Sequence, residues 1–218
     1  MRCAHCAMSC TAKGQDMSQK TFDACLALAA NTSSMVTLGG GEPTLHPLFK
    51  NFLMQAVWEL TSVSDDTGCT AIHVITNGSK TDIAINLARL ARQGVISAEV
   101  SQDRYHAPID ERVVKAFTFS HTSILPRNEH DFRGIRNTSK NGTVIAAGRA
   151  KKLTDIDFNG DCICSDLFVT PDGSVYPCGC LKTKLGHISK PTFDWYSGGE
   201  CENSTYYREW LQEKTDNV

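Results

Sequence analysis

Apolar residues recur with a helical spacing in four stretches of the chain. In QKTFDACLALAA (19–30), Phe22, Leu26 and Ala29 fall on one helical face, and Ser18 precedes them as a suitable N-cap. The same spacing predicts three further helices, over 47–60, 79–94 and 110–117. The N-terminal two thirds of the chain is therefore rich in amphipathic helix.

Short runs of apolar and β-branched residues lie between and after these helices. They predict strands over 35–38, 71–76, 95–101 and 143–148, with further strands around 121–125 and 132–135. Strands that alternate with helices indicate parallel βα units. Five or six such units are too few for a complete eight-stranded barrel. We therefore expect an α/β fold built as a partial (β/α)6-type TIM barrel.

The pattern changes after residue 160. In LFVTPDGSVYP (167–177) a Pro-Asp-Gly turn separates two short β-prone runs, which predicts a β-hairpin. TYYREWLQEK (205–214) predicts a helix near the end of the sequence. We expect two domains: a partial barrel over 1–155, and a small cysteine-rich extension of hairpin and helix over 156–218.

The composition is that of a globular protein. Of the 218 residues, 41% are hydrophobic and 21% are charged, and the net charge is -2. This balance argues against a nucleic-acid or membrane partner, and no apolar run reaches the roughly 18 residues of a membrane span. The N-terminus has no charged-then-apolar secretion segment. We therefore expect a cytoplasmic protein whose ten cysteines are reduced metal ligands or core residues.

Two stretches carry candidate chemistry. Cys3, Cys6 and Cys10 lie within the first ten residues, and in LGGGEPTLHP (38–47) a predicted strand runs into three glycines and Glu42. Glycines let a backbone approach a ligand closely, and parallel sheets bind ligands at the carboxyl ends of their strands. The Gly-Lys-Ser/Thr of a phosphate loop is absent, and an acidic residue repels phosphate. The loop therefore suits a ligand with a positive group, such as an amine.

The clustered cysteines, the GGEP loop and ITNGS (75–79) together resemble the radical S-adenosylmethionine (radical SAM) superfamily. In that family three cysteines hold a 4Fe–4S cluster whose open iron binds SAM, and SAM is cleaved to a 5′-deoxyadenosyl radical that abstracts hydrogen from a substrate. The resemblance implies that Cys3, Cys6 and Cys10 are the cluster ligands. Their spacing, C-x2-C-x3-C, reverses the usual C-x3-C-x2-C.

The resemblance also implies a set of SAM-binding residues. The family's GGE loop, which binds the SAM amino group, corresponds to Gly39, Gly40, Gly41 and Glu42. The polar residues that follow later strands in the family, near the SAM site, correspond to Asn77, Ser101 and Asp103. Arg149 lies in a GRA sequence that many members have near the sixth strand.

The C-terminal cysteines resemble the SPASM/twitch extension, whose hairpin holds an auxiliary iron–sulfur cluster. The match rests on the C-x10-G-x4-C pattern of Cys162, Gly173 and Cys178. A cluster needs at most four of the available thiols, which are Cys162, Cys164, Cys178, Cys180 and Cys201. The favoured set omits Cys164, which is the alternative ligand. Tetrahedral zinc on the two C-x-C pairs, or no metal at all, are the other hypotheses.

As a radical SAM enzyme, the protein would need a one-electron donor of the flavodoxin or ferredoxin type. The twitch-like end favours a peptide or protein substrate. A nucleotide or other small anionic molecule is the alternative, because residues 127–152 carry seven basic and two acidic side chains. The competing non-enzymatic hypothesis is a zinc- or iron–sulfur-binding module, which would not need the GGEP loop.

Overall fold

The computed structural model describes residues 3–32, 35–60, 71–118, 134–136, 148–153 and 167–192. The chain divides into two compact units. One consists mainly of Leu26–Asn141, and the other joins Arg2–Cys25 to Gly142–Val218. The N-terminal cysteines therefore belong to the same unit as the C-terminal hairpin. The predicted domain boundary between 155 and 156 lies outside the described residues.

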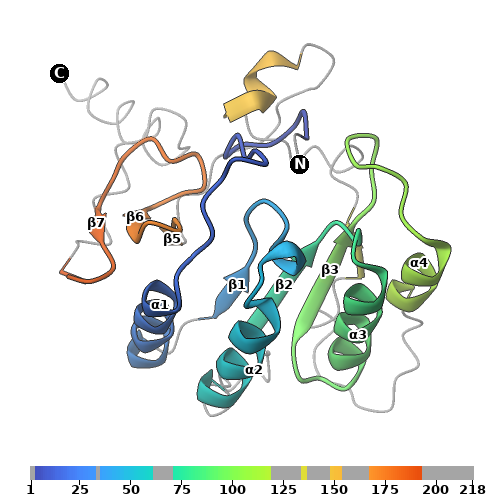
Figure 1. The fold of residues 1–218 in the computed structure, drawn as a ribbon, viewed down its shortest axis with the longest axis horizontal. Coiled ribbons are helices and arrows are strands. Elements are labelled where there is room, and N and C mark those ends of the chain that lie inside the picture. Colours follow the sequence, from blue (N-terminus) through green and yellow to red (C-terminus); the bar gives the residue numbers. More distant parts are fainter. Residues whose placement is uncertain are drawn as a thin grey trace, which may run out of the picture. The chain divides into compact units, whose positions relative to one another are not determined.

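The first unit is built on a four-stranded parallel sheet in the order β1-β2-β3-β4 (Figure 1). The strands are β1 (Val36–Leu38), β2 (Ile72–Thr76), β3 (Ser97–Ser101) and β4 (Gly134–Arg136). The predicted α/β class with parallel units is confirmed. These four described strands do not close on themselves, and the partial TIM barrel stays a prediction.

Helices follow three of the four strands. They are α2 (Phe49–Leu60) after β1, α3 (Thr81–Arg92) after β2 and α4 (Glu111–Phe117) after β3. The helix predicted from residue 47 starts at Phe49, because Pro43–Leu45 forms a separate 3-10 turn, η1. His46 then accepts a hydrogen bond from the N–H of Leu48 through Nδ1 at 3.0 Å. The chain thus changes direction between the GGEP loop and α2.

Helix α1 (Gln19–Thr32) confirms the first predicted helix. The hydroxyl of Ser18 accepts a hydrogen bond from the N–H of Thr21 at 3.1 Å, as expected of an N-cap. Phe22 and Leu26 are buried, and Leu26 is fully so. The amphipathic spacing of this segment therefore predicted both the helix and its buried side.

The two faces of the parallel sheet differ in polarity. Figure 1 shows α2 and α3 in front of the sheet. Val100 is fully buried and lies with Val113 of α4 around Gly78, which puts Val100 on the helix-covered face. Because side chains alternate along a strand, Ser97 and Glu99 of β3 point to the opposite face. That second face is polar, although a sheet covered on both sides is normally apolar throughout.

The second unit contains a three-stranded antiparallel sheet. Its strands are β5 (Phe168–Val169), β6 (Ser174–Tyr176) and β7 (Gly186–His187), in that order. The predicted hairpin is confirmed, and its turn is held by Asp172, which accepts hydrogen bonds from Thr170 and Ser174. A short 3-10 helix, η2 (Gly148–Lys152), belongs to the same unit.

Several predicted elements fall partly or wholly outside the described residues. The helix over 205–214 and the strand around 121–125 lie outside the described residues. So does the strand over 143–148, except for Gly148, which begins η2. The strand predicted around 132–135 is present as β4.

Candidate functional site

The cysteine loop, residues 3–10, consists of two successive turns around Cys6. The N–H of Cys6 donates to the carbonyl of Cys3 at 3.3 Å, and the N–H of Ser9 donates to the carbonyl of Cys6 at 3.3 Å. The N–H of Cys10 donates to Sγ of Cys6, also at 3.3 Å. The three predicted cluster ligands therefore share one loop, and each is half-buried with a free thiol.

Helix η2 contacts this loop directly. The backbone N–H of Arg149 donates to the carbonyl of Cys6 at 3.1 Å, and its side-chain Nε donates to the carbonyl of Cys3 at 3.0 Å. Gly148 adopts a φ of 52°, and a Cβ at this position would collide with the carbonyl of Ala7. Arg149 was predicted near SAM. The structure puts it on the backbone of the cysteine loop, and its contact with SAM stays a prediction.

Burial and charge control the thiols of the loop. Burial, followed by the neighbouring Cys6, raises the pKa of both Cys3 and Cys10, while the positive charge of Arg149 acts in the opposite direction. The thiols of Cys3 and Cys10 are therefore protonated at neutral pH. Cys25 of α1 differs, because burial alone raises its pKa to about 11. This makes Cys25 an unreactive thiol.

The turn at Cys178 repeats the geometry of the turn at Cys6. The N–H of Leu181 donates to the carbonyl of Cys178 at 3.2 Å, as Ser9 does to Cys6, and both donor residues have a φ of 55°. The N–H of Cys180 donates to Sγ of Cys178 at 3.4 Å. Hydrogen bonds from N–H groups to sulfur favour the thiolate and tune a bound cluster.

The remaining predicted auxiliary ligands, Cys162, Cys164 and Cys201, lie outside the described residues. Cys178 and Cys180 are both half-buried free thiols. The described part of the predicted auxiliary site therefore offers two thiols in a turn of the same kind as the N-terminal loop.

The spacing of the thiols bears on which metal they could hold. In the described ranges, no three thiols lie within 4.8 Å of one another. A single tetrahedral zinc with Zn–S bonds of about 2.3 Å brings its sulfurs to roughly 3.8 Å. A polynuclear cluster binds each thiolate through a different iron and accepts a wider spacing. The described thiols therefore do not form a single-ion zinc site as they stand, and their spacing gives no positive indication of an iron–sulfur cluster.

Glu42 ties together the carboxyl ends of β1 and β2. Its buried carboxylate accepts hydrogen bonds from the hydroxyl of Thr76 at 2.7 Å, from the N–H of Asn77 at 2.6 Å, and from both the N–H and the hydroxyl of Thr44. Gly40 adopts a φ of 115°, and a Cβ there would meet nothing within 4 Å. The glycine loop is thus an open turn on a rigid base. Binding of the SAM amino group by Gly39–Glu42 stays a prediction.

Polar groups also follow β3. Ser101 is buried at the end of the strand. The fully buried side chain of Asp103 accepts a hydrogen bond from the N–H of Tyr105 at 2.9 Å, and its Oδ1 lies 2.8 Å from Nδ1 of His106. Because an ionised carboxylate only accepts, Nδ1 of His106 donates the proton of this hydrogen bond. Asp103 therefore orients His106.

A buried group on the polar face of the sheet was not predicted. Nδ1 of His73 lies 2.8 Å from the hydroxyl of Ser97, and its Nε2 lies 3.8 Å from Oε2 of Glu99. Arg136 Nη1 is 4.0 Å from the same oxygen. Burying the polar His73 ring and the Glu99 carboxylate costs desolvation, which makes these residues candidates for a functional role. The signal available in the sequence was a histidine and a glutamate inside the otherwise apolar strands AIHVIT and VISAEVS.

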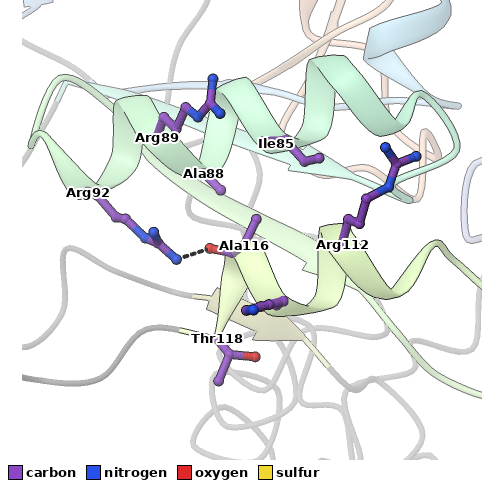
Figure 2. A pocket seen from close by; sticks show the side chains of 8 residues that line it. Ile85, Ala88, Arg89, Arg92, Arg112, Ala116 and Thr118 are labelled. Atoms are coloured by element: carbon purple, nitrogen blue, oxygen red, sulfur yellow. Dashed lines mark hydrogen bonds between the residues drawn. The ribbon is translucent and has the colours of Figure 1, made fainter.

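A pocket lies between α3 and α4, on the helical layer (Figure 2). Its volume is about 490 Å³, and the cations that line it are Arg89, Arg92, Arg112 and Lys115. Figure 2 shows Arg92 directed at the carbonyl of Ala116, to which it donates at 2.7 Å. Arg112 pairs with Asp110. Arg92 and Arg112 thus contact the two ends of α4. The pocket is a solvent-exposed groove lined by basic side chains.

Within the described ranges, no helix is long and apolar enough to cross a membrane. The chain was compared with protein families, with curated proteins and with solved structures. No family model, no curated protein and no solved structure matches it.

Proposed function

We propose that the protein is a radical SAM enzyme. The main observation behind the proposal is the cysteine loop. Its two turns and one N–H···S hydrogen bond hold three half-buried thiols in a segment of eight residues. The open glycine turn at the carboxyl end of β1 supports it, because parallel sheets bind ligands at that edge. A 4Fe–4S cluster with SAM supplies the reductive cleavage of SAM to a 5′-deoxyadenosyl radical, which takes a hydrogen atom from a substrate.

The residues of the chain have distinct roles in this proposal. Cys3, Cys6 and Cys10 would hold the cluster as thiolates, one iron each, and the remaining iron would be open to SAM. The backbone at Gly40 admits the SAM amino group, and Glu42 keeps that backbone fixed through its bonds to Thr44, Thr76 and Asn77. A fixed binding loop lowers the entropic cost of orienting a bound ligand.

The second unit supports an auxiliary iron–sulfur site in this proposal. Cys178 and Cys180 provide two of its ligands, because their turn repeats the one at Cys6. The other ligands come from Cys162, Cys164 and Cys201. A one-electron donor of the flavodoxin or ferredoxin type reduces the N-terminal site.

The substrate proposed first is a peptide or protein, and a nucleotide or other small anionic molecule is the second candidate. The polar face of the sheet supports a polar substrate, since His73, Ser97 and Glu99 are held there at a desolvation cost. Arg136 favours the anionic candidate, because its side chain is 36% exposed and only loosely paired with Glu99.

The experiment is an anaerobic reconstitution with iron and sulfide, followed by dithionite and SAM, with 5′-deoxyadenosine measured by chromatography. The wild type and Cys25→Ala should form the nucleoside, whereas Cys6→Ala should not. The reason is that Cys6 is one of the three thiols of the cysteine loop, while Cys25 lies in α1. A wild type that binds iron and sulfide but forms no 5′-deoxyadenosine would contradict the enzyme proposal and favour a non-enzymatic cluster module.

A further inference from the structure

The contact between η2 and the cysteine loop joins residues that are 146 positions apart. We propose that Gly148 and Arg149 form a clamp that presets the cysteine loop for its cluster and holds a positive charge beside it. The proposal has two halves. The first half, that the clamp presets the loop, concerns the loop alone, and the second half, that its charge acts on the cluster, rests on the proposed function. Arg149 is a positioning residue here, since it touches the backbone of the ligands and not their sulfurs.

The loop needs support from outside itself. Its own two turns are closed by hydrogen bonds of 3.3 Å, whereas the two bonds from Arg149 are shorter, at 3.0 and 3.1 Å. Fixing the backbone of a short segment costs conformational entropy. Two anchors on the carbonyls of Cys3 and Cys6 restrict the loop before any metal binds. A ligand set held in place beforehand loses less freedom on binding.

Both residue types of the clamp are specific. Gly148 needs a left-handed φ of 52° and a bare Cα, since a Cβ would collide with the carbonyl of Ala7. Arg149 bonds Cys3 through Nε, which lies part-way along its side chain, and lysine has no donor at that place. The bond is charge-assisted, because the guanidinium is always protonated. An Arg149→Lys substitution therefore keeps the charge and loses the bond.

The charge of the clamp has a consequence for reduction. A 4Fe–4S cluster on three thiolates carries negative charge, and reduction adds one more electron. A guanidinium next to it stabilises the reduced form more than the oxidised form, which raises the reduction potential. Removing the charge should therefore make the potential more negative.

The first half of the proposal is tested on the metal-free full-length protein, by the alkylation rate of its thiols. Trypsin releases 3–13, which contains Cys3, Cys6 and Cys10 and no other cysteine, and 21–50, which contains only Cys25. Mass spectrometry then gives the rate for the loop against an internal reference thiol. With each rate corrected for its thiolate fraction from the pH dependence, we expect Gly148→Ala and Arg149→Gln to speed alkylation of 3–13 several-fold and to leave 21–50 unchanged.

Matched variants separate the clamp from general effects. Gly94→Ala places a side chain at another left-handed glycine, with a φ of 70°, in the other unit. Arg89→Gln removes an exposed arginine of α3. Neither should change the rate for 3–13. Slow alkylation of Cys25 reports that each variant is folded, and if Gly148→Ala fails this check, Arg149→Gln carries the test. Equal rates for 3–13 in the wild type and in folded clamp variants would overturn the proposal.

The second half is tested on the reconstituted protein by iron content and by potentiometric titration of the EPR signal. Arg149→Gln should bind less iron and titrate at a more negative potential. Arg149→Lys should also alkylate fast when metal-free, but should titrate near the wild type. An unchanged potential in Arg149→Gln would overturn the charge role. If the wild type binds no cluster, the proposed function fails, while the alkylation rates still decide the clamp.

Discussion

Oε2 of Glu42 accepts a hydrogen bond from the backbone N–H of Asn77 at 2.6 Å. This bond links the loop after β1 to the loop after β2, at the carboxyl edge of the parallel sheet. Oε1 of the same carboxylate takes the hydroxyl of Thr76 at 2.7 Å. The glutamate of the GGEP loop is thus a structural link between the two loops that follow β1 and β2.

Replacing this carboxylate should destabilise the fold. Glu42→Gln keeps one oxygen but turns an N–H₂ group toward hydrogen-bond donors, which should cost about 1–3 kcal/mol of unfolding free energy. Urea unfolding followed by circular dichroism measures the loss. The matched control is Glu59→Gln, an exposed residue of α2 bonded to Gln55, which should stay within about 0.5 kcal/mol. A loss in Glu42→Gln no larger than in the control would contradict the link.

The reversed cysteine spacing makes a prediction about Cys10. Single alanine variants of Cys3, Cys6 and Cys10 should each bind less iron than the wild type after anaerobic reconstitution, because the three thiols share one loop. Cys25→Ala should bind as much as the wild type, since its thiol is a buried part of α1. Full iron loading in Cys10→Ala would remove Cys10 from the ligand set.

The hairpin turn predicts a pH-dependent contribution to stability. Hydrogen bonds from the hydroxyl of Thr170 and the N–H of Ser174 lower the pKa of Asp172 to about 2. A carboxyl group with a depressed pKa in the folded state adds stability above its unfolded pKa of about 3.9, and that stability is lost as the pH falls toward 2. NMR titration of the side-chain carboxyl carbons should give a midpoint for Asp172 well below the model-peptide value of about 3.9. A midpoint at that model-peptide value would contradict the network.

The contact between β2 and β3 on the polar face should appear as an energetic coupling. His73→Phe strands the hydroxyl of Ser97, and Ser97→Ala strands Nδ1 of His73, so each should cost about 1–3 kcal/mol. The double variant removes both partners and should cost less than the sum of the two. Unfolding free energies of the four proteins give the coupling, which we expect at about 0.5–3 kcal/mol. Strict additivity would mean that the contact contributes nothing.

Local sequence patterns predicted most of the helices and strands that the structure describes. The helical spacing of 79–94 predicted α3, and Gly94 ends it in the left-handed region with a φ of 70°. Alternation of strands and helices predicted parallel pairing, which β1 to β4 have. These features depend on neighbouring residues, so periodicity and turn chemistry contain them.

Relations between distant residues were beyond such patterns. Nothing near Arg149 in the sequence encodes a bond to Cys3, because the partner lies 146 positions away. The bond between His73 and Ser97 depends on the register of β2 against β3, which only tertiary packing fixes. Local patterns therefore name candidate site residues, but they do not show which distant residues hold these candidates in place.

The most direct test of the central claim is an EPR spectrum of the reduced protein with and without SAM, recorded on a variant that carries Cys178→Ala and Cys180→Ala. These substitutions remove two proposed auxiliary ligands, so that the signal comes from the cysteine loop. We predict a reduced-cluster signal whose g values shift when SAM is added, because SAM binds the open iron. A protein that binds no cluster, or a cluster signal that SAM leaves unchanged, would contradict the assignment of a radical SAM site.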